Sequence, residues 1–219
     1  MARSAWKHMQ TEGFSPGQIR AIMAANPPRR PVMPSLLQST ANTRPVLPGN
    51  DRLLRSDVPL SPTPADVDFL LSRSITTLID LRSEAEITRK PCSLASDARF
   101  TYHHMPVTGG NAMPNSPADV PLSYLRMVDA QMERILRTIQ ESEGVMYFCT
   151  AGKDRTGVVS ALLQREYGMS PEAIAAEYAL SGDHLQSLFT DFYARHPEIN
   201  VEIYTPKKEY MLQFLAMLA

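Results

Sequence analysis

The stretch "VMYFCTAGKDRTGVVSALLQREYG", residues 145–168, joins two kinds of local structure in one short segment. Its first five residues are apolar and include aromatic and β-branched side chains, which predicts a buried strand ending at Cys149. The part "TGVVSALLQREYG" has the spacing of a helix that ends at Gly168. A strand that runs through a glycine-containing loop into a helix is typical of an α/β fold.

The segments before this stretch alternate in the same way. In "SPTPADVDFLLSRS", Thr63 is a predicted N-cap, Pro64 the first helical residue and Asp66 the partner in a capping box, so a helix is expected at about 64–73. The sequence "ITTLIDL" predicts a buried strand ending near Asp80, and "RFTYHHMPV" predicts a second strand. The loop "TGGNAMPNSPADVP" offers little to pack and is either a lid or a solvated connector.

Three further helices are predicted. The segment "LSYLRMVDAQMERILRTIQESEG" has apolar residues at helical spacing and reads as one amphipathic helix that stops at Gly144. Another helix begins at Pro171 with Ser170 as its N-cap, and "TPKKEYMLQFLAML" forms the last. The alternation predicts an α/β fold with a central, largely parallel sheet flanked by helices.

The N-terminal residues differ in character from the rest. Residues 1–36 contain one short helix candidate, "PGQIRAIMAAN", followed by "PPRRPVMP", whose prolines favour an extended connector. We expect residues 1–36 to be an N-terminal arm, a poorly ordered tail in preference to a docking arm, and residues 37–219 to form a single domain. A single domain of this size is compatible with a monomer.

Composition limits the classes of partner and compartment. The formal net charge is -1, which gives no reason to expect a nucleic-acid footprint. Cys92 and Cys149 are the only cysteines, so a disulfide scaffold is excluded and a reducing compartment fits. No signal-peptide core and no segment of membrane-spanning length is present, which favours a cytoplasmic protein, although non-classical export would leave no trace in the sequence.

The loop after Cys149 has the composition of an anion-binding site. The backbone N–H groups of Thr150, Ala151, Gly152, Lys153 and the residues that follow can converge on one tetrahedral anion at a helix N-terminus. The same position favours the thiolate form of Cys149. A guanidinium six residues on, at Arg155, can hold two phosphate oxygens at once. These residues predict nucleophilic displacement at phosphorus that needs no metal and no cofactor.

The full string "CTAGKDRTG" is more specific than a bare Cys-x5-Arg spacing. In its strand–loop–helix setting it resembles the signature loop of cysteine-dependent protein tyrosine and dual-specificity phosphatases. The part "AGKDRTG" is similar to a bacterial and fungal branch that also acts on phosphoinositides. The segments "NTRPVLPGNDRLLRSDVPLS", "TLIDLRSEAE" and "EYALS" resemble other parts of that branch, so the resemblance covers about residues 40–215.

The resemblance implies a role for each loop residue. It makes Cys149 the nucleophile, Arg155 the phosphate clamp and Thr156 a hydrogen-bond donor to the thiolate. It likens Lys153 to a lysine that meets extra phosphates on an inositol ring, and Asp154 to a proposed proton donor. The expected substrate is a phosphorylated protein, on tyrosine and also on serine or threonine, or a phosphoinositide.

The proton donor is left open among three aspartates. Asp80, at the end of its strand, and Asp119, in the loop, are alternatives to Asp154, and Asp80 is also a candidate phosphate-binding residue. The only tryptophan is Trp6, which excludes a tryptophan-bearing W-P-D acid loop. Arg82 and Glu86 are expected to form an ion pair that braces the signature loop.

One residue departs from the family pattern. Phe148 stands where the family usually has a histidine directly before the nucleophile, so weakened activity is expected. A second hypothesis follows, in which the chain is a phosphate-binding or phosphoinositide-binding module with degraded catalysis. A third, a thiol protease or transferase, is disfavoured because it leaves Arg155 and the anion site without a role.

Overall fold

The computed structural model describes residues 34–218. The chain separates into two units, Met1–Met33 and Pro34–Ala219, and the description below concerns the second. The helix predicted at "PGQIRAIMAAN" and Trp6 lie outside the described residues. The last residues of the predicted arm are bonded into the second unit, since the Leu36 N–H donates to the Thr43 carbonyl over 3.0 Å.

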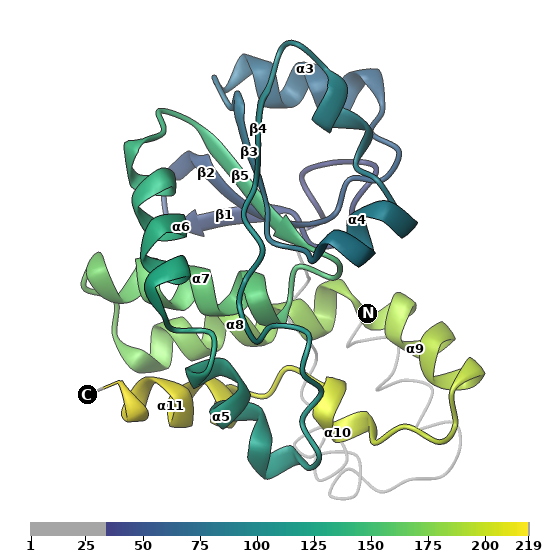
Figure 1. The fold of residues 1–219 in the computed structure, drawn as a ribbon, viewed down its shortest axis with the longest axis vertical. Coiled ribbons are helices and arrows are strands. Elements are labelled where there is room, and N and C mark those ends of the chain that lie inside the picture. The colour runs from purple at the N-terminus through teal and green to yellow at the C-terminus, as the bar shows by residue number, and fades with distance from the viewer. Residues whose placement is uncertain (1–33, 219) are drawn as a thin grey trace, which may run out of the picture. The chain divides into compact units, whose positions relative to one another are not determined.

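A five-stranded sheet in the order β1-β2-β5-β3-β4 forms the centre (Figure 1). The strands are β1 (Arg44–Leu47), β2 (Asn50–Asp57), β3 (Thr77–Asp80), β4 (Thr101–His104) and β5 (Val145–Cys149). β2, β5, β3 and β4 pair in parallel, and β1 alone pairs antiparallel, with β2. The predicted α/β class and largely parallel sheet are therefore confirmed.

The helices connect and cover the strands. They are α3 (Pro64–Ser72), α4 (Glu84–Arg89), α5 (Val120–Leu125), α6 (Ala130–Glu141), α7 (Asp154–Glu166), α8 (Pro171–His184), α9 (Gln186–Arg195), α10 (Val201–Tyr204) and α11 (Lys208–Met217), with short 3-10 turns at Ser93–Ser96 and Pro117–Asp119. The predicted start of α3 is confirmed in detail, because Thr63 caps it and exchanges capping-box hydrogen bonds with Asp66. None of the helices between Pro34 and Leu218 is long and apolar enough to cross a membrane.

The single amphipathic helix predicted before β5 is wrong, since the chain forms two helices there. α5 ends at Leu125 and α6 begins at Ala130. The Asp129 carboxylate accepts hydrogen bonds from the N–H groups of Gln131 and Met132, over 3.0 Å each. A side-chain cap of this kind starts a new helix and overrides the apolar spacing that continues across the break.

The two faces of the sheet carry separate hydrophobic cores, and β5 contributes to both. Val145, Tyr147 and Cys149 face one cluster with residues of α5, α6, α7, α8 and α11. Met146 and Phe148 face the other cluster, with residues of α3. The alternation of a strand therefore places Phe148 on the opposite face from Cys149. Burial on both faces holds the strand that carries Cys149 rigidly.

Candidate active site

The predicted strand–loop–helix unit is present. Cys149 is the last residue of β5, and α7 begins at Asp154. Between them Gly152 adopts φ +64°, and a Cβ added there would lie 2.5 Å from the carbonyl carbon of Ser56. Only glycine fits this turn, because it alone tolerates both the left-handed backbone and the contact with β2.

Hydrogen bonds hold the loop from behind. Asn42 Nδ2 donates to the carbonyls of Ala151, over 3.0 Å, and Gly152, over 2.9 Å, and Arg55 Nη2 donates to the Gly152 carbonyl over 2.8 Å. Because a trans peptide points its N–H away from its C=O, these bonds aim the following N–H groups to the opposite side. That orientation is the one an anion-binding loop needs.

A buried ionic network supports these donors. The Glu177 carboxylate of α8 accepts from Arg44 Nε over 2.7 Å and from Arg55 Nη1 over 2.6 Å. Arg44 also donates to Asn42 and to Ser181 Oγ. Burial, partly offset by Glu177, lowers the pKa of Arg44 to about 10. The network joins the segments "NTR" and "EYALS", two of the stretches that carry the family resemblance.

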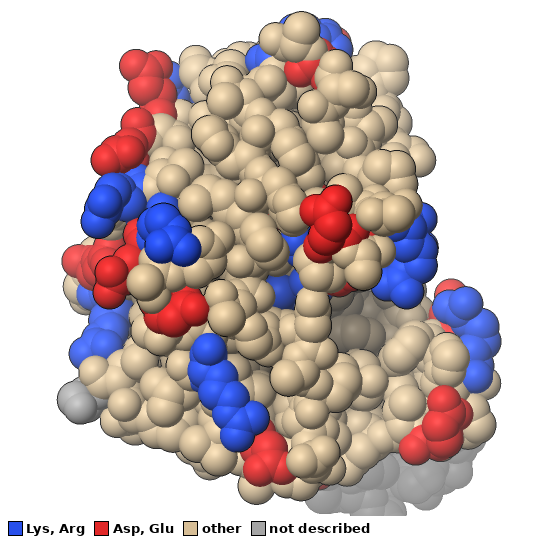
Figure 2. Space-filling view, viewed as in Figure 1, with Lys and Arg blue, Asp and Glu red and all other residues tan. Residues whose placement is uncertain are grey.

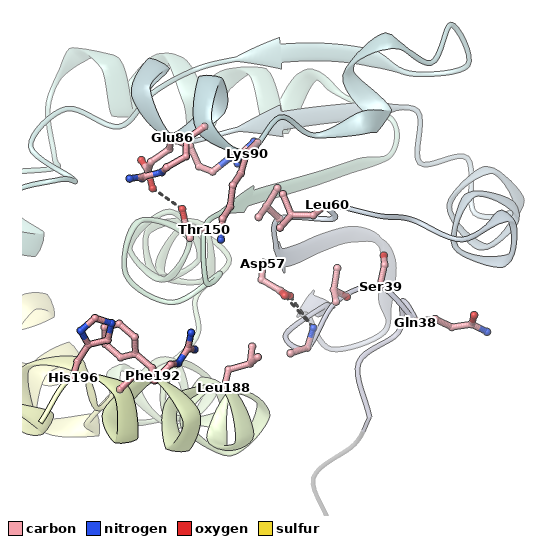
Figure 3. Close-up of a pocket in the computed structure, with 16 residues that line it drawn as sticks. Gln38, Ser39, Asp57, Leu60, Glu86, Lys90, Thr150, Leu188, Phe192 and His196 are labelled. Atoms are coloured by element: carbon pink, nitrogen blue, oxygen red, sulfur yellow. Dashed lines mark hydrogen bonds between the residues drawn. The ribbon is translucent and has the colours of Figure 1, made fainter.

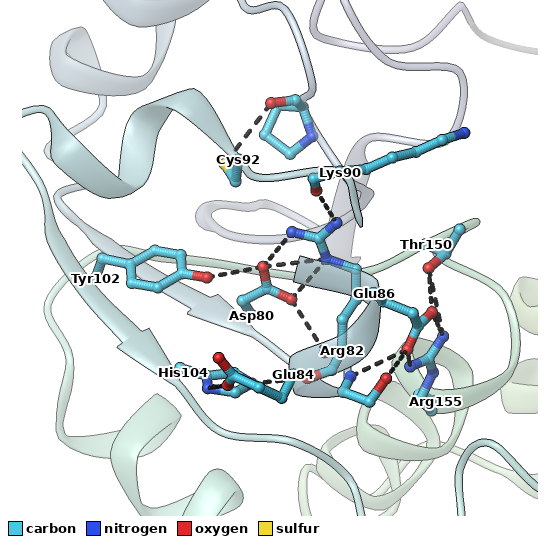
Figure 4. A network of polar contacts seen from close by, with 12 residues as sticks. Asp80, Arg82, Glu84, Glu86, Lys90, Cys92, Tyr102, His104, Thr150 and Arg155 are labelled. Atoms are coloured by element: carbon cyan, nitrogen blue, oxygen red, sulfur yellow. Dashed lines mark hydrogen bonds and ion pairs between the residues drawn. The ribbon is translucent and has the colours of Figure 1, made fainter. Parts of the chain in front are cut away.

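Arg155 is held by a carboxylate from α4 (Figure 4). Its Nη1 and Nη2 donate to the two oxygens of Glu86 over 2.6 and 2.8 Å, and Thr150 Oγ1 donates to the same carboxylate over 2.5 Å. Burial opposes ionisation of both partners, yet their mutual bonds raise the pKa of Arg155 and lower that of Glu86. Glu86 thus braces the signature loop as expected, but its arginine is Arg155.

The expected pair between Arg82 and Glu86 does not form. Arg82 instead donates from Nε and Nη2 to Asp80, at distances from 2.6 to 3.1 Å, and Tyr102 Oη donates to the same carboxylate over 2.8 Å. Asp80 is fully buried. The hydrogen bonds drawn to Asp80 in Figure 4 all come from Arg82 and Tyr102. Neither the phosphate-binding role nor the proton-donor role of Asp80 therefore gains support.

Asp154, one of the three candidate proton donors, is hydrogen-bonded and partly exposed. Its Oδ1 accepts from Tyr124 Oη over 2.5 Å, and Tyr124 is hydrogen-bonded in turn to Tyr178 over 2.6 Å. The side chain remains 40% exposed, so a substrate can reach it. Asp119 is occupied in a capping box, where it accepts from the backbone and hydroxyl of Ser116.

The ammonium group of Lys153 is bound within the protein. Its Nζ donates to the Tyr204 carbonyl over 2.6 Å and lies 3.2 Å from Asp154 Oδ1. The residue is 4% exposed, and its ammonium group lies 5.9 Å from the ring centres of Phe189 and Tyr204. In this conformation Lys153 anchors α10 to the signature loop.

Thr156 and the loop before α5 complete the surroundings. Thr156 Oγ1 is buried and has no hydrogen-bond partner within the part of the chain that the structure describes. A buried hydroxyl without a partner is costly, so this group is available to bond to a ligand or to a neighbouring side chain. Asn111 Oδ1 accepts from Arg155 Nη1 over 3.2 Å, and a Cβ on Gly110 would lie 2.6 Å from Arg155 Cδ.

A groove opens beside Thr150 (Figure 3). Its volume is about 900 Å³. Its lining comes from residues 38–41, from the end of β2 and the residues that follow it, from α4 and the residues that flank it, from Thr150, and from α9 with His196. A smaller cavity of about 70 Å³ borders Lys153 and Asp154. The signature loop is therefore accessible from the groove at its first residue and from this cavity near its last.

Sequence reasoning missed several residues that position this site. Asn42, Tyr124 and Glu177 contact the loop or its neighbours from 30 to more than 100 residues away along the chain. Asn42 and Glu177 lie in or beside stretches that the resemblance had marked, so that signal was available. Nothing in the spacing around Tyr124 or Asn111 indicated a contact with Asp154 or Arg155.

Comparison with known proteins assigns the family. The model of the tyrosine phosphatase family matches residues 39–219, so the chain belongs to that family. It is 32% identical over 135 residues to a tyrosine-protein phosphatase of Nostoc commune, covering 57% of this chain and 46% of that protein. It is 28% identical over 186 residues to a Cupriavidus necator protein named as a tyrosine-protein phosphatase, covering 75% of this chain and 66% of that protein.

The chain therefore spans about half the length of the first of these curated relatives and 66% of the second. Among solved structures, the crystal structure of P. aeruginosa TpbA aligns over 88% of this chain and 100% of its own, with 18% identity and a TM-score of 0.46. A structure of TpbA in complex with phosphotyrosine aligns with a TM-score of 0.44 and 18% identity, over 87% of this chain and 99% of its own.

Proposed function

We propose that this protein hydrolyses phosphotyrosine esters through a cysteinyl-phosphate intermediate, without a metal. The observation that carries the proposal is the geometry of the loop from Cys149 to Arg155. Asn42 donates hydrogen bonds to carbonyls of this loop, and Glu86 binds the guanidinium of Arg155. A preorganised ring of N–H donors and a fixed guanidinium stabilise charge on a phosphoryl group with little reorganisation.

In the first step, Cys149 Sγ attacks phosphorus and the bond from phosphorus to the ester oxygen breaks. Asp154 donates its proton to that leaving oxygen, held for this purpose by Tyr124. The Arg155 guanidinium binds two phosphoryl oxygens as they become equatorial in the transition state. Glu86 occupies two of its five N–H groups, so phosphate takes Nε–H and displaces the longer contacts to Asn111 and Thr150.

In the second step, water attacks the phosphocysteine and the sulfur–phosphorus bond breaks. Asp154, now a carboxylate, accepts the proton from water and so returns to its starting form. The free hydroxyl of Thr156 stabilises the departing thiolate. Inorganic phosphate then leaves the loop.

Phosphotyrosine is the leading substrate because the family and both relatives are named for it. Phosphoserine, phosphothreonine and phosphoinositides are the alternatives. The phosphoinositide alternative depends on Lys153, whose ammonium group is committed to the Tyr204 carbonyl.

The test is phosphate release from a phosphotyrosine peptide, a phosphoserine peptide and a phosphoinositide panel, with a chelator present throughout. We expect release from the phosphotyrosine peptide, and its loss in Cys149→Ser and Arg155→Lys. Cys92→Ser is the matched control, because Cys92 is buried in the other core and its thiol donates to the Pro59 carbonyl. Activity that requires added metal, or that persists in Cys149→Ser, contradicts the proposal.

A weakened binding module is the second candidate, and Phe148 is the observation that favours it. Phe148 is fully buried in an apolar cluster, and its ring offers no hydrogen bond beside the nucleophile. If catalysis is degraded, Phe148→His increases turnover at least about tenfold, equivalent to about 1.4 kcal/mol in the barrier. Unchanged or reduced turnover leaves the enzyme hypothesis as the better one.

A further inference from the structure

We propose that the groove beside Thr150 binds the residues that flank a phosphotyrosine and that it selects peptides with acidic side chains. The inference rests on the proposed function, because it places a phosphotyrosine in the loop that Thr150 begins. It adds a class of protein substrate and the residues that recognise it.

The groove is built to receive an extended chain beside the loop. Figure 3 shows Lys90, the residue that follows α4, on one side, with Leu188 and Phe192 of α9 facing it from the other. Thr150, the residue after Cys149, lines the groove, so a peptide held in the signature loop can continue into it. The groove volume of about 900 Å³ accommodates several side chains.

The acidic side chains that line the groove are neutralised or withdrawn. Glu86 is paired with Arg155. The carboxylate of Asp57 accepts from the N–H groups of Ala41 and Asn42 at 2.8 to 3.1 Å, and its burial raises its pKa. Neither carboxylate therefore contributes a free negative charge to the groove.

Three of the basic side chains lack such compensation. Arg89 and Lys90 at the end of α4, and Arg195 at the end of α9, have no ion-pair partner among residues 34–218, and Arg195 donates only to the Asp191 backbone carbonyl. Arg82, by contrast, is paired with Asp80. Figure 2 shows basic side chains over α4 and α9 at the right of the view. The uncompensated charge is positive, so the complementary peptide is acidic.

Apolar side chains in the same groove favour a peptide over a membrane. Leu60 is 38% exposed and Leu188 is 51% exposed, and both line the groove together with Phe192. An extended peptide points successive side chains to opposite sides, so it can meet a cation and an apolar wall in turn. A bilayer needs its apolar contacts on an open face, whereas these lie inside a recess between two helices.

The test measures binding of fluorescent phosphotyrosine peptides to the full chain carrying Cys149→Ser, which holds substrate without turnover. Three peptides are compared, with glutamate, glutamine or lysine at the flanking positions. We expect the glutamate peptide to bind about tenfold more tightly than the glutamine peptide at low salt, since exposed ion pairs contribute modestly and add up. The combined variant Arg89→Glu, Lys90→Glu, Arg195→Glu should reduce this ratio to about one or below.

Arg137→Glu is the matched control, because Arg137 is exposed on α6, away from α4 and α9 in Figure 1, and should leave the ratio unchanged. Equal binding of the three peptides, or a ratio that survives the combined variant, overturns the inference. So does tighter binding to phosphatidylcholine vesicles containing phosphoinositide, if that binding is lost in the combined variant.

Turnover by the wild-type protein separates the two proposals. Phosphate release without peptide selectivity removes the groove inference and leaves the proposed function intact. Selective binding without phosphate release from any ester removes the proposed catalysis and leaves the groove as a recognition surface.

Discussion

The absence of a side chain at Gly152 determines how closely the signature loop approaches β2. Its positive φ and its contact with the backbone of Ser56 bring the signature loop against β2. That close approach allows Asn42 and Arg55 to reach the loop carbonyls. The geometry of the anion site therefore depends on a residue that contributes no side chain to it.

We expect Gly152→Ala to lower the free energy of unfolding by roughly 3 kcal/mol or more, and to abolish activity, because it adds a backbone collision to the strain of a positive φ. Gly168→Ala is the control. Gly168 has φ +77° but open space at its Cβ position, so that variant should lose only about 1 kcal/mol. Denaturant titration measures both, and equal losses would show that the contact with Ser56 is unimportant.

Tyr124→Phe tests the assignment of the proton donor. Removing the hydroxyl frees Asp154 from its 2.5 Å hydrogen bond, so kcat should fall about tenfold or more for substrates with poor leaving groups. A substrate with a good leaving group needs less protonation and should be affected less. Tyr102→Phe is the control, since that hydroxyl bonds to Asp80. Equal loss with both substrates would indicate a structural role for Tyr124.

At the scale of elements, α8 reaches the signature loop through two arginines. Glu177 binds Arg44 of β1 and Arg55 of β2 in a buried setting, and Arg55 continues to the loop. α8 therefore helps to position the loop through a carboxylate and two guanidinium groups that lie behind the loop.

Glu177→Gln leaves two buried guanidinium groups without their carboxylate. We expect it to reduce the free energy of unfolding by about 3–5 kcal/mol, the usual cost of an uncompensated buried charge. Glu172→Gln, on the exposed first turn of the same helix, should change it by less than about 1 kcal/mol. A Glu177→Gln loss as small as that of the control would contradict the network's role.

The elements also show what local sequence can predict. Strands and helices with strong patterns, such as β5, α3 and α8, follow from periodicity and caps. β1 and β2 were not assigned, because Arg44, Asn50, Asp51 and Arg55 interrupt their apolar pattern. Arg44 and Arg55 are bound by Glu177, far away along the chain, and no local rule reveals such a partner.

The candidate site, like the fold, has parts that the local sequence predicts and parts that it does not. The proposed roles of Cys149 and Arg155 follow from spacing and resemblance within nine residues. The ion-pair partner of Glu86 cannot be predicted from the local sequence, since Arg82 and Arg155 are both available. The choice between them depends on β3, which buries Asp80 beside Arg82.

At the scale of the whole molecule, the ion pair between Glu86 and Arg155 links stability to pH. Its bonds lower the pKa of Glu86 in the folded state below the ordinary 4.5. A lowered carboxyl pKa stabilises the fold fully above the unfolded value, and this contribution is lost as the pH falls through the folded value.

Glu86→Gln should therefore be less stable than wild type at pH 7, by about 1–3 kcal/mol, and the difference should shrink as the pH is lowered below 4.5. Urea titrations from pH 7 to pH 3 measure it. Glu84→Gln, whose carboxyl group is largely exposed at the start of the same helix, should show little difference at any of these values. A Glu86→Gln difference that is constant with pH would contradict the coupling.

The bonds from Asn42 to the loop carbonyls join residues 109 and 110 positions apart. Contacts of such long separation form late, because much of the chain must be ordered before they can close. In a nascent or partly unfolded chain, Cys149 is therefore present before the anion-binding loop around it has formed. Reactivity of this thiol toward phosphate esters should appear only when the whole domain has folded, which confines the chemistry to the completed molecule.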